Sequence, residues 1–426
     1  MLAALALAAS LADCVPMRWS GAHPLTTLDG SPITCLLLEE PQWTLIEEAR
    51  SRGLRTLAIV RTQAQAERAA KRNPDAIVSE SSGISSTMPM IHLGARNEIR
   101  FDTPAPIIGT SQAVWPGIEI EHGGPKATSA APTGSAWIHT NTGFLRFVRA
   151  VAKAPFWLAN TPPPGTAFPA KRYAQAVSDA AAAGARWVLA FDDKLPPSEW
   201  KPVFDTVRFY EAHSGWRAMK PWAEVAIVQD ERSGALITGS LLDMLSVMNT
   251  PVRAIPSRQL NAAAIEGAKV TVAIDPQAYT AEQRALLAKH GGKLVTGPNS
   301  WRMPEPSAGR ITFDKAQYKE LEAIWPELHL AVQRKNFGVR MFNVTGVLTY
   351  LLRSDKQVVL HLVNYTDYPV ENITAFVQGK YAAAQLLTPN SAGRPLRTYA
   401  APDGTAIEID RLETSAAVLL ETGPQH

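Results

Sequence analysis

Several short apolar segments in the first half of the chain end in carboxylates. Residues 33–40 read ITCLLLEE, residues 76–80 read AIVSE, and residues 186–193 read RWVLAFDD. Buried parallel strands have such continuous aliphatic sequences, and in a β/α barrel the residues just past the strands line one mouth. Hydrolysis of a glycosidic bond needs two carboxyl groups there, one as general acid and one as nucleophile or general base. The catalytic candidates are therefore Glu39, Glu80, Asp192 and Asp193.

Each acid also has a purely structural alternative. Glu80 is followed by the polar loop SSGISS, where it could cap a helix or bond its own loop. Asp192 and Asp193 are adjacent, so at most one of them faces a ligand, and the other would pair with a barrel arginine such as Arg61. Glu39 and its neighbour Glu40 precede a proline, and one could simply begin the next helix, where the helix dipole favours negative charge.

Aromatic and polar residues near the presumed strand ends add binding candidates. Tryptophans at 43, 115 and 137 lie in or just after such loops, and their flat rings can stack on the C–H faces of a sugar. The long loop from 115 to 139 also carries carboxylates and a histidine, which can hydrogen-bond hydroxyl groups. His92 and His122 lack the close ligand spacing of a metal site. The substrate-binding candidates are Glu40, Trp43, Arg61, Trp115, Glu119, Asn141 and Asn160.

Composition restricts the class of protein. The 426 residues exceed one ordinary core and indicate about two or three domains. An apolar fraction of 46% against 19% charged is typical of packed globular domains. Lys and Arg outnumber Asp and Glu by only 42 to 39, without a dense basic run, so a nucleic-acid partner is not expected. No GxGxxG or phosphate-binding loop follows a strand, so no cofactor is expected.

The N-terminal segment and the two cysteines bear on the compartment. MLAALALAASLADC is rich in Ala and Leu, which fits either a secretory signal remnant or a helix packed on the first domain. LADC resembles a bacterial lipobox, but Asp13 departs from the expected small residue, so a lipid anchor at Cys14 is not expected. No other stretch could span a membrane. For Cys14 and Cys35 two buried free thiols are favoured, with one disulfide as the alternative.

The first part of the chain, residues 1–197, predicts a compact (β/α)₈ barrel. Strand-like and helix-like segments alternate at the short spacing of βα units. A typical barrel has about 250 residues, so several helices must be short or missing, especially between residues 80 and 105. The eight expected strands cover residues 15–19, 33–40, 56–60, 76–80, 88–94, 105–111, 154–160 and 186–193.

Two further domains are expected. Residues 198–310 contain a bridging helical stretch and then strands such as AEVAIVQD and KVTVAIDP alternating with helices, which is a doubly wound α/β pattern. Residues 311–426 contain short strands separated by turn residues, after a helix that ends near Lys335. This spacing is typical of a small antiparallel β-sandwich.

Three phrases carry a family resemblance: VAIVQDERSG and KHGGKLVTGP in the middle domain, and VVLHLVNYT in the last. With the order barrel, α/β domain and sandwich, the chain resembles bacterial family 42 β-galactosidases, whose middle domain resembles a class I glutamine amidotransferase. The resemblance implies a glycoside hydrolase with a non-catalytic middle domain that helps to form a homo-oligomer. Because no cysteine follows Cys35, the middle domain lacks the thiolate that glutamine hydrolysis needs.

The resemblance also implies catalytic glutamates after the fourth and seventh barrel strands. Glu80 matches the fourth strand, but the seventh ends in Asn160, so the partner of Glu80 would be Asp192, Asp193 or a glutamate of the second strand. Two hypotheses follow. The chain is a secreted or periplasmic glycoside hydrolase acting on oligo- or polysaccharides, or a catalytically silent barrel that binds carbohydrate or serves as a structural partner. A close pair of inward carboxylates, one with a raised pKa, would favour the enzyme.

Overall fold

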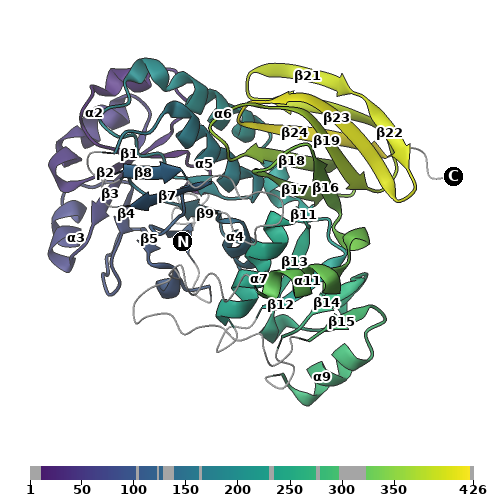
Figure 1. Cartoon of the computed structure of the whole chain (residues 1–426). Helices are drawn as coiled ribbons and strands as arrows, with labels where there is room; N and C mark the ends of the chain where they lie inside the picture. The colour runs from purple at the N-terminus through teal and green to yellow at the C-terminus, as the bar shows by residue number, and fades with distance from the viewer. Residues whose placement is uncertain are drawn as a thin grey trace. The chain divides into compact units, whose positions relative to one another are not determined.

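The computed structural model describes residues 11–101, 105–121, 124–127, 139–162, 166–229, 235–274, 279–296 and 323–422 (Figure 1). Contacts divide the chain into two units. The first comprises residues 1–126 and 152–217, and the second comprises residues 127–151 and 218–426.

The first unit contains eight parallel strands that pair in chain order, each with the next. After the last strand, Leu189 forms a parallel bridge with Met17 of the first, and the Arg18 amide donates to the Leu189 carbonyl at 2.7 Å. The predicted eight-stranded barrel is confirmed. Its strands are β1 (Pro16–Trp19), β2 (Cys35–Leu38), β3 (Arg55–Val60), β4 (Ala76–Ser79), β5 (Met90–Gly94), β6 (Ile108–Thr110), β9 (Phe156–Leu158) and β10 (Arg186–Trp187).

The segments that connect the barrel strands differ in length and in helix content, because the barrel is small. Thr62 caps α3 by accepting a hydrogen bond from the Gln65 amide, and Gly53 follows α2 with a φ of +77°, which glycine adopts without strain. Between β4 and β5 the Gly- and Ser-rich chain forms turns instead of a helix. The helical segments are η1 (Leu25–Leu28), η2 (Glu40–Leu45), α2 (Ile46–Ser51), α3 (Gln63–Ala70), η3 (Arg96–Glu98), α5 (Ala170–Ala182), η4 (Pro197–Glu199), α6 (Lys201–Ala212) and η5 (Ser214–Ala218).

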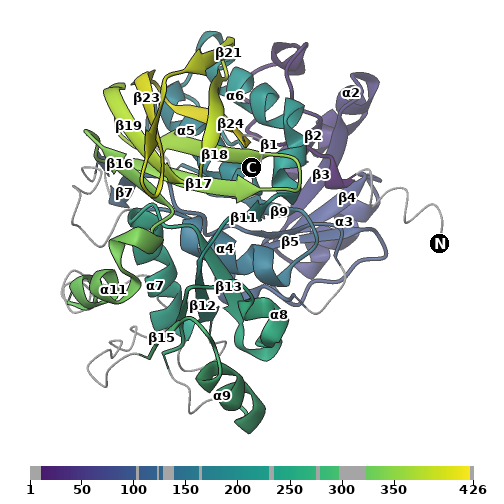
Figure 2. The same ribbon diagram turned by 90° about the vertical axis from the view of Figure 1, so that its right-hand side faces the viewer.

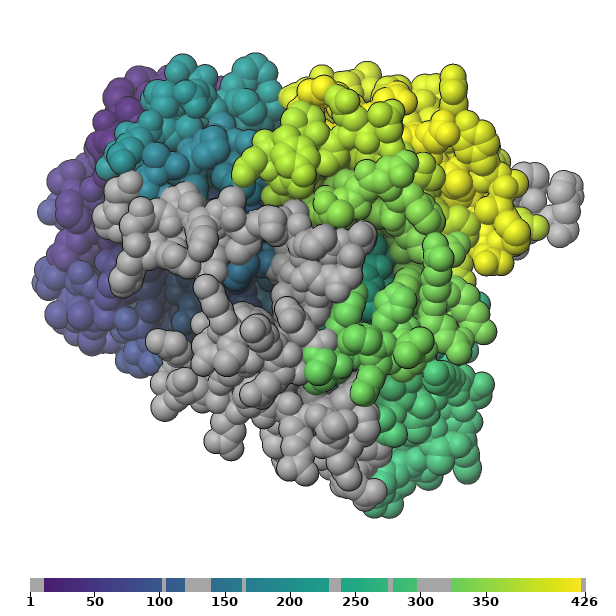
Figure 3. All heavy atoms as spheres, viewed as in Figure 1, coloured from purple at the N-terminus to yellow at the C-terminus, as the bar shows by residue number. Residues whose placement is uncertain are grey.

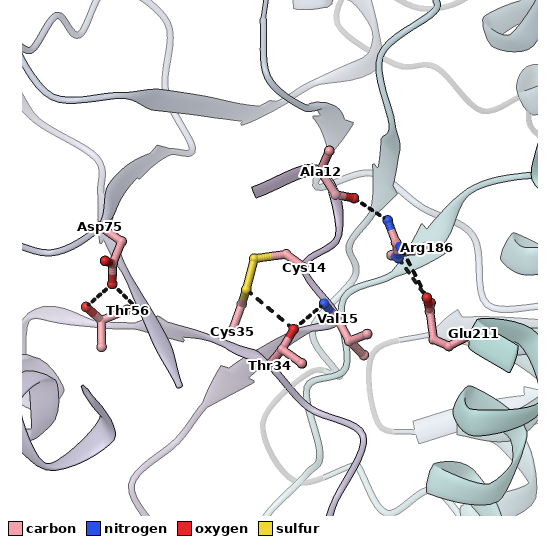
Figure 4. Close-up of a disulfide and its surroundings, with 9 residues drawn as sticks. All are labelled: Ala12, Cys14, Val15, Thr34, Cys35, Thr56, Asp75, Arg186 and Glu211. Atoms are coloured by element: carbon pink, nitrogen blue, oxygen red, sulfur yellow. Dashed lines mark hydrogen bonds and ion pairs between the residues drawn. A yellow bond between two sulfur atoms is a disulfide. The ribbon is translucent and has the colours of Figure 1, made fainter. Parts of the chain in front are cut away.

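A disulfide joins Cys14 and Cys35, so the expectation of two free thiols is wrong (Figure 4). The parallel register sets Pro16 opposite Cys35, which brings Cys14 beside it with a Cα–Cα distance of 5.6 Å. Both cysteines are buried in the barrel core. The Thr34 hydroxyl beside the bond accepts from the Val15 amide at 2.9 Å. The bond occupies the Cys14 sulfur that a lipid anchor would need. Residues 1–10 of the expected N-terminal helix lie outside the described residues, whereas Leu11 is buried in the core.

The second unit begins with a parallel four-stranded sheet of order β13-β12-β14-β15. One face packs against α7 and α11, and the other packs against Leu260 and residues of α8 and α9, so the sheet is covered on both faces as a doubly wound domain requires. Helix α4 (Thr142–Val151), expected within the barrel domain, belongs to this unit and packs on α7 and β13. The other elements are β12 (Val225–Gln229), α7 (Ala235–Val247), β13 (Val252–Pro256), η6 (Ser257–Gln259), α8 (Ala262–Ile265), β14 (Val270–Val272), α9 (Ala281–Ala288), β15 (Lys293–Val295), α11 (Ile324–Val332) and η8 (Arg334–Asn336).

The C-terminal part of this unit is the predicted antiparallel β-sandwich (Figure 2). One sheet has the order β11-β17-β18-β24-β20-β21, and the other has the order β16-β19-β23-β22. Alternating aliphatic residues from both sheets form the core between them. The strands are β11 (Lys220–Pro221), β16 (Val339–Phe342), β17 (Val347–Arg353), β18 (Val358–Asn364), β19 (Val370–Gln378), β20 (Tyr381–Thr388), β21 (Ser391–Leu396), β22 (Thr398–Ala401), β23 (Gly404–Leu412) and β24 (Ser415–Thr422).

Two features complete the description. Strands β7 (Ile118–Glu121) and β8 (Gly124–Ala127) form a separate two-stranded sheet. Within the described part of the chain, no helix has the length and apolar character needed to cross a membrane.

Candidate active site at the barrel mouth

Four consecutive barrel strands each place one charged residue toward the same end of the sheet. Arg18 is in β1, Glu39 follows β2, Arg61 follows β3, and Glu80 follows β4. The strands pair in parallel (Figure 1), so their carboxyl ends lie together, which is where barrel enzymes carry their active sites. The sequence-predicted acids Glu39 and Glu80 are therefore brought together, with two arginines between them.

These four side chains form a closed set of ion pairs. Nη1 of Arg18 lies 2.7 Å from Oε1 of Glu80, and Arg18 also pairs with Glu39. Nη2 of Arg61 lies 2.8 Å from Oε1 of Glu39 and 2.8 Å from Oε2 of Glu80. Because one nitrogen contacts both carboxylates, the two oxygens cannot be farther apart than twice that distance. The two acids are therefore close enough to act on a single ligand.

The arginines decide the charge of Glu39. Burial alone would raise the pKa of this carboxyl, but hydrogen bonds and charge from Arg61 and Arg18 outweigh burial and lower the pKa below its usual value. In turn, the hydrogen bond that Arg61 donates to Glu39 raises the pKa of Arg61. Glu39 is thus held ionised, which suits a nucleophile, a base or an electrostatic stabiliser and does not suit a proton donor.

Asp192 is bonded into the barrel wall. Its carboxylate accepts hydrogen bonds from the Tyr173 hydroxyl at 2.8 Å, the Lys194 amide at 3.0 Å and the Phe168 amide at 3.2 Å. The Asp192 amide also donates to the Tyr173 oxygen at 2.9 Å. Burial, together with the nearby Asp192 carboxylate, raises the pKa of Tyr173. These contacts orient the segment after β10. Asp192 therefore has a structural role, which its position in the sequence does not indicate.

Asp193 differs from its neighbour in environment. It is exposed, and among the described residues it forms no hydrogen bond or ion pair. The expected ion pair between one of these aspartates and Arg61 is wrong, because Arg61 binds Glu39 and Glu80 instead. Asp193 lines a small pocket together with Arg18, and this pocket connects the aspartate to the ion-paired cluster.

Most residues of that pocket, His23 and Trp200 among them, were not sequence candidates. His23 packs edge-on against Trp200 with ring centroids 5.6 Å apart, and Trp200 stacks on Phe191 at 4.7 Å. Arg18 was also missed, although a single arginine inside the apolar segment VPMRW is an unusual feature of a buried strand. His23 and Trp200 come from irregular segments, and no local sequence signal marks them.

The remaining predicted binding residues are placed less favourably for one site. Glu40 pairs with Arg68 of α3 at 2.8 Å, and hydrogen bonds from Arg68 and Gln65 lower the pKa of Glu40. Trp43 is buried and donates its indole N–H to the Leu38 carbonyl. Trp115 is buried with its ring centroid 4.7 Å from that of Phe168. Neither tryptophan therefore offers a free ring face to a sugar.

The asparagines and the long loop complete the comparison. Asn160 follows β9, the seventh strand, and its amide donates to the Ala113 carbonyl at 2.6 Å. Asn141 is fully buried and belongs to the second unit. Glu119 lies in β7, but its side chain is outside the described residues, as are Trp137 and His122. Within the described ranges, no three His, Cys, Asp or Glu side chains group in a way that could hold a metal.

Comparison with known proteins supports the fold but not a sequence family. No family model matches the chain, and no curated protein matches it in sequence. An alpha-L-fucosidase, isoenzyme 2 from Paenibacillus thiaminolyticus, matches with a TM-score of 0.58 at 10% identity, covering 93% of this chain and 96% of that chain. A GH42 β-galactosidase from G. stearothermophilus matches with a TM-score of 0.54 at 9% identity, covering 96% of this chain and 98% of that chain.

A catalytic mutant of the same GH42 β-galactosidase gives a TM-score of 0.53 at 10% identity, covering 96% of this chain and 98% of that chain. Identity this low shows a shared fold and no more. The resemblance to family 42 enzymes is thus confirmed at the level of the fold, from the barrel to the β-sandwich.

Proposed function

We propose that this chain is a glycoside hydrolase whose substrate binds at the carboxyl-terminal mouth of the barrel. The observation that carries the proposal is the pair of carboxylates, Glu39 after β2 and Glu80 after β4, held by two shared arginines from β1 and from the end of β3. The full-length fold match to glycoside hydrolases supports the same class of reaction.

The proposed mechanism divides the acids by environment. Asp193, which is exposed and has no arginine contact, donates a proton to the oxygen of the leaving group as the glycosidic C–O bond breaks. As that bond breaks, a carboxylate of Glu39 or Glu80 bonds to the anomeric carbon, or it removes a proton from the water that attacks this carbon. In the first case water then hydrolyses the glycosyl ester, and Asp193 takes the proton of that water. The positive charge that develops on the sugar ring is stabilised by the ionised carboxylates. In this scheme Arg18 and Arg61 position the anions, while Asp192 positions the segment that carries Asp193.

One specific observation favours the second candidate, a silent barrel that binds carbohydrate. In the family that the sequence resembles, a glutamate follows the seventh strand, whereas here Asn160 stands there and bonds Ala113. In addition, Glu39 is fixed in its ionised form by two arginines. A binding protein can use such a rigid set of donors and acceptors to hold sugar hydroxyls without breaking a bond.

A panel of aryl glycosides and of plant and bacterial polysaccharides distinguishes the glycoside hydrolase from the silent barrel that binds carbohydrate. We would compare the native protein with Glu39→Gln, Glu80→Gln and Asp193→Asn, and with Glu40→Gln as the matched control, because Glu40 pairs with Arg68 outside the cluster. Loss of about a thousandfold in kcat for Asp193→Asn and for one glutamate variant, with Glu40→Gln unchanged, identifies the pair. Sugars that the native protein binds in calorimetry but does not cleave would instead establish the binding candidate.

We further propose an exported location, either periplasmic or extracellular. The Cys14–Cys35 disulfide supports it, because such bonds persist in oxidising compartments. Because both cysteines are buried, alkylation of the protein in cells lysed directly into denaturant tests this. Cysteines that react only after reduction agree with export, and cysteines that react at once contradict it. The homo-oligomer implied by the family resemblance stays a prediction.

A further inference from the structure

The outer face of the four-stranded sheet in the sandwich carries one row of side chains across all its strands. Val339, Ile373 and Ile407 point into the sandwich core, so the alternate residues point outward. In the outward row, β16 residue 340 pairs with β19 residue 376, which pairs with β23 residue 406, which pairs with β22 residue 399. These residues are Arg340, Phe376, Ala406 and Tyr399, and the next row begins with Phe342.

This face is unusually rich in exposed aromatic surface. Tyr399 is 47% exposed and Phe342 is 39% exposed, and they are two of only four large apolar side chains exposed among the described residues. The small Ala406 separates Tyr399 from Phe376 and leaves room above the sheet. The β16, β19, β22 and β23 strands can be followed in Figure 2. In the space-filling view the sandwich, coloured green to yellow, presents a continuous packed surface (Figure 3).

Two arginines lie over these rings. The guanidinium carbon of Arg340 is 3.8 Å from the centroid of Phe376, and that of Arg334 in η8 is 5.9 Å from the centroid of Phe342. Neither arginine forms an ion pair with any described residue. Other arginines of the sandwich do, since Arg394 pairs with Asp410 and Arg411 pairs with Glu371. The cations at this face are therefore stacked on rings and lack a bound carboxylate.

The positive charges of Arg334 and Arg340 act on each other at this face. Burial and the charge of Arg334 lower the pKa of Arg340, and only the charge of Asp403 opposes them. Burial, followed by the same Arg334 charge, lowers the pKa of His329 in α11. Cations that repel one another in this way are stabilised by an anion that arrives from solution.

We propose that this Arg-aromatic face (Arg334, Arg340, Phe342, Phe376 and Tyr399) binds an acidic polysaccharide. Its carboxylate groups would accept paired hydrogen bonds from the two guanidinium groups, and its sugar rings would stack on Tyr399 and Phe342. Charge complementarity selects an anionic occupant. Glu408 lies on the same face and accepts a hydrogen bond from the Tyr399 hydroxyl at 3.1 Å. This carboxylate can also accept hydrogen bonds from sugar hydroxyl groups, which the phosphates of a nucleic acid do not offer, so a polysaccharide fits better.

The test is affinity electrophoresis of the native chain in gels containing polygalacturonate or neutral galactan. We expect retardation by polygalacturonate alone, weakened by added salt as the exposed charges are screened. The double variant Arg334→Gln/Arg340→Gln should raise the dissociation constant at least tenfold. Tyr399→Ala should weaken binding without any change of charge. Arg411→Gln is the matched control, because it removes an exposed but ion-paired arginine from the same sheet and should bind as the native chain does.

Several outcomes would overturn the proposal. These are no retardation of the native chain, an equal loss in Arg411→Gln, or equally tight binding of a single-stranded DNA oligonucleotide, which would show a general polyanion surface. Thermal unfolding of each variant checks that the sandwich stays folded. The assay measures binding without hydrolysis, and Asp193→Asn should retain it, so failure here is distinguishable from failure of the proposed hydrolase.

Discussion

Arg18 and Glu80 are 62 residues apart in the chain, yet Nη1 of the arginine lies 2.7 Å from Oε1 of the glutamate. Their strands, β1 and β4, are not neighbours in the sheet, so this ion pair reaches past the strand ends of β2 and β3. Arg18 also binds Glu39, and it is therefore the residue that connects the two acids of the candidate site.

Replacing Arg18 with Gln should destabilise the barrel. Glu39 and Glu80 would then share only Arg61, and two partly buried carboxylates would repel each other. We expect the free energy of unfolding to fall by about 1–3 kcal/mol, measured by urea denaturation at neutral pH. Arg68→Gln, which breaks the exposed pair with Glu40, should change it much less, because solvent screens that pair. An equal loss of stability in the two variants would show that the ion pairs of Arg18 contribute no more than the exposed pair of Arg68.

Substitutions of the two adjacent aspartates should affect different properties: stability for Asp192 and activity for Asp193. Asp192→Asn disturbs hydrogen bonds from Tyr173 and from two backbone amides, so we expect a loss of about 1–3 kcal/mol in the free energy of unfolding. Asp193→Asn should leave stability within about 0.5 kcal/mol of the native value and should remove sugar release. Unfolding curves and initial rates on the same preparations decide the matter. Full activity in Asp193→Asn would exclude it as the acid.

Glu39 should make stability depend on acidity. Its pKa is lower in the folded protein than the ordinary 4.5 of a solvated glutamate, so its ionised form stabilises the fold at pH values above 4.5. This contribution is lost as the pH falls through the lowered folded pKa. Unfolding measured from pH 7 down to pH 3 should therefore show a shallower decline in Glu39→Gln than in the native chain. Glu47→Gln, whose side chain is 83% exposed, should follow the native curve. Parallel curves for Glu39→Gln and the native protein would contradict this assignment.

The disulfide should stabilise the start of the barrel. It closes a loop between residues 21 positions apart, for which chain entropy predicts about 3 kcal/mol. The double variant Cys14→Ser/Cys35→Ser should lose about that amount in urea denaturation without a reducing agent. With a reducing agent present, the native chain should approach the variant. If the agent leaves the native curve unchanged, the bond does not carry this stability.

The order of the barrel, the α/β domain and the sandwich along the chain could be predicted from the sequence. Burial on both faces leaves a continuous aliphatic pattern in each parallel strand. Segments such as TLAIV and AIVSE became β3 and β4 with ends displaced by one residue. The helix-like segments expected between the barrel strands include α3 and α5. The unit to which α4 belongs could not be predicted, because its amphipathic pattern shows that it packs but not on which sheet.

For the candidate site, the sequence determined which carboxylates follow the barrel strands, and so it placed Glu39, Glu80, Asp192 and Asp193 at one mouth without deciding which of them pair. Only the tertiary structure decided what surrounds them. The arginines from β1 and β3, the hydrogen bonds that fix Asp192, the burial of Trp43 and Trp115, and the Cys14–Cys35 bond all depend on strand register and side-chain packing. Hydrophobic pattern is a local property of the chain, whereas ion pairs and a disulfide join residues brought together by the closure of the barrel. The local pattern therefore specifies the fold, and the closed barrel sets the charge and the accessibility of each candidate residue.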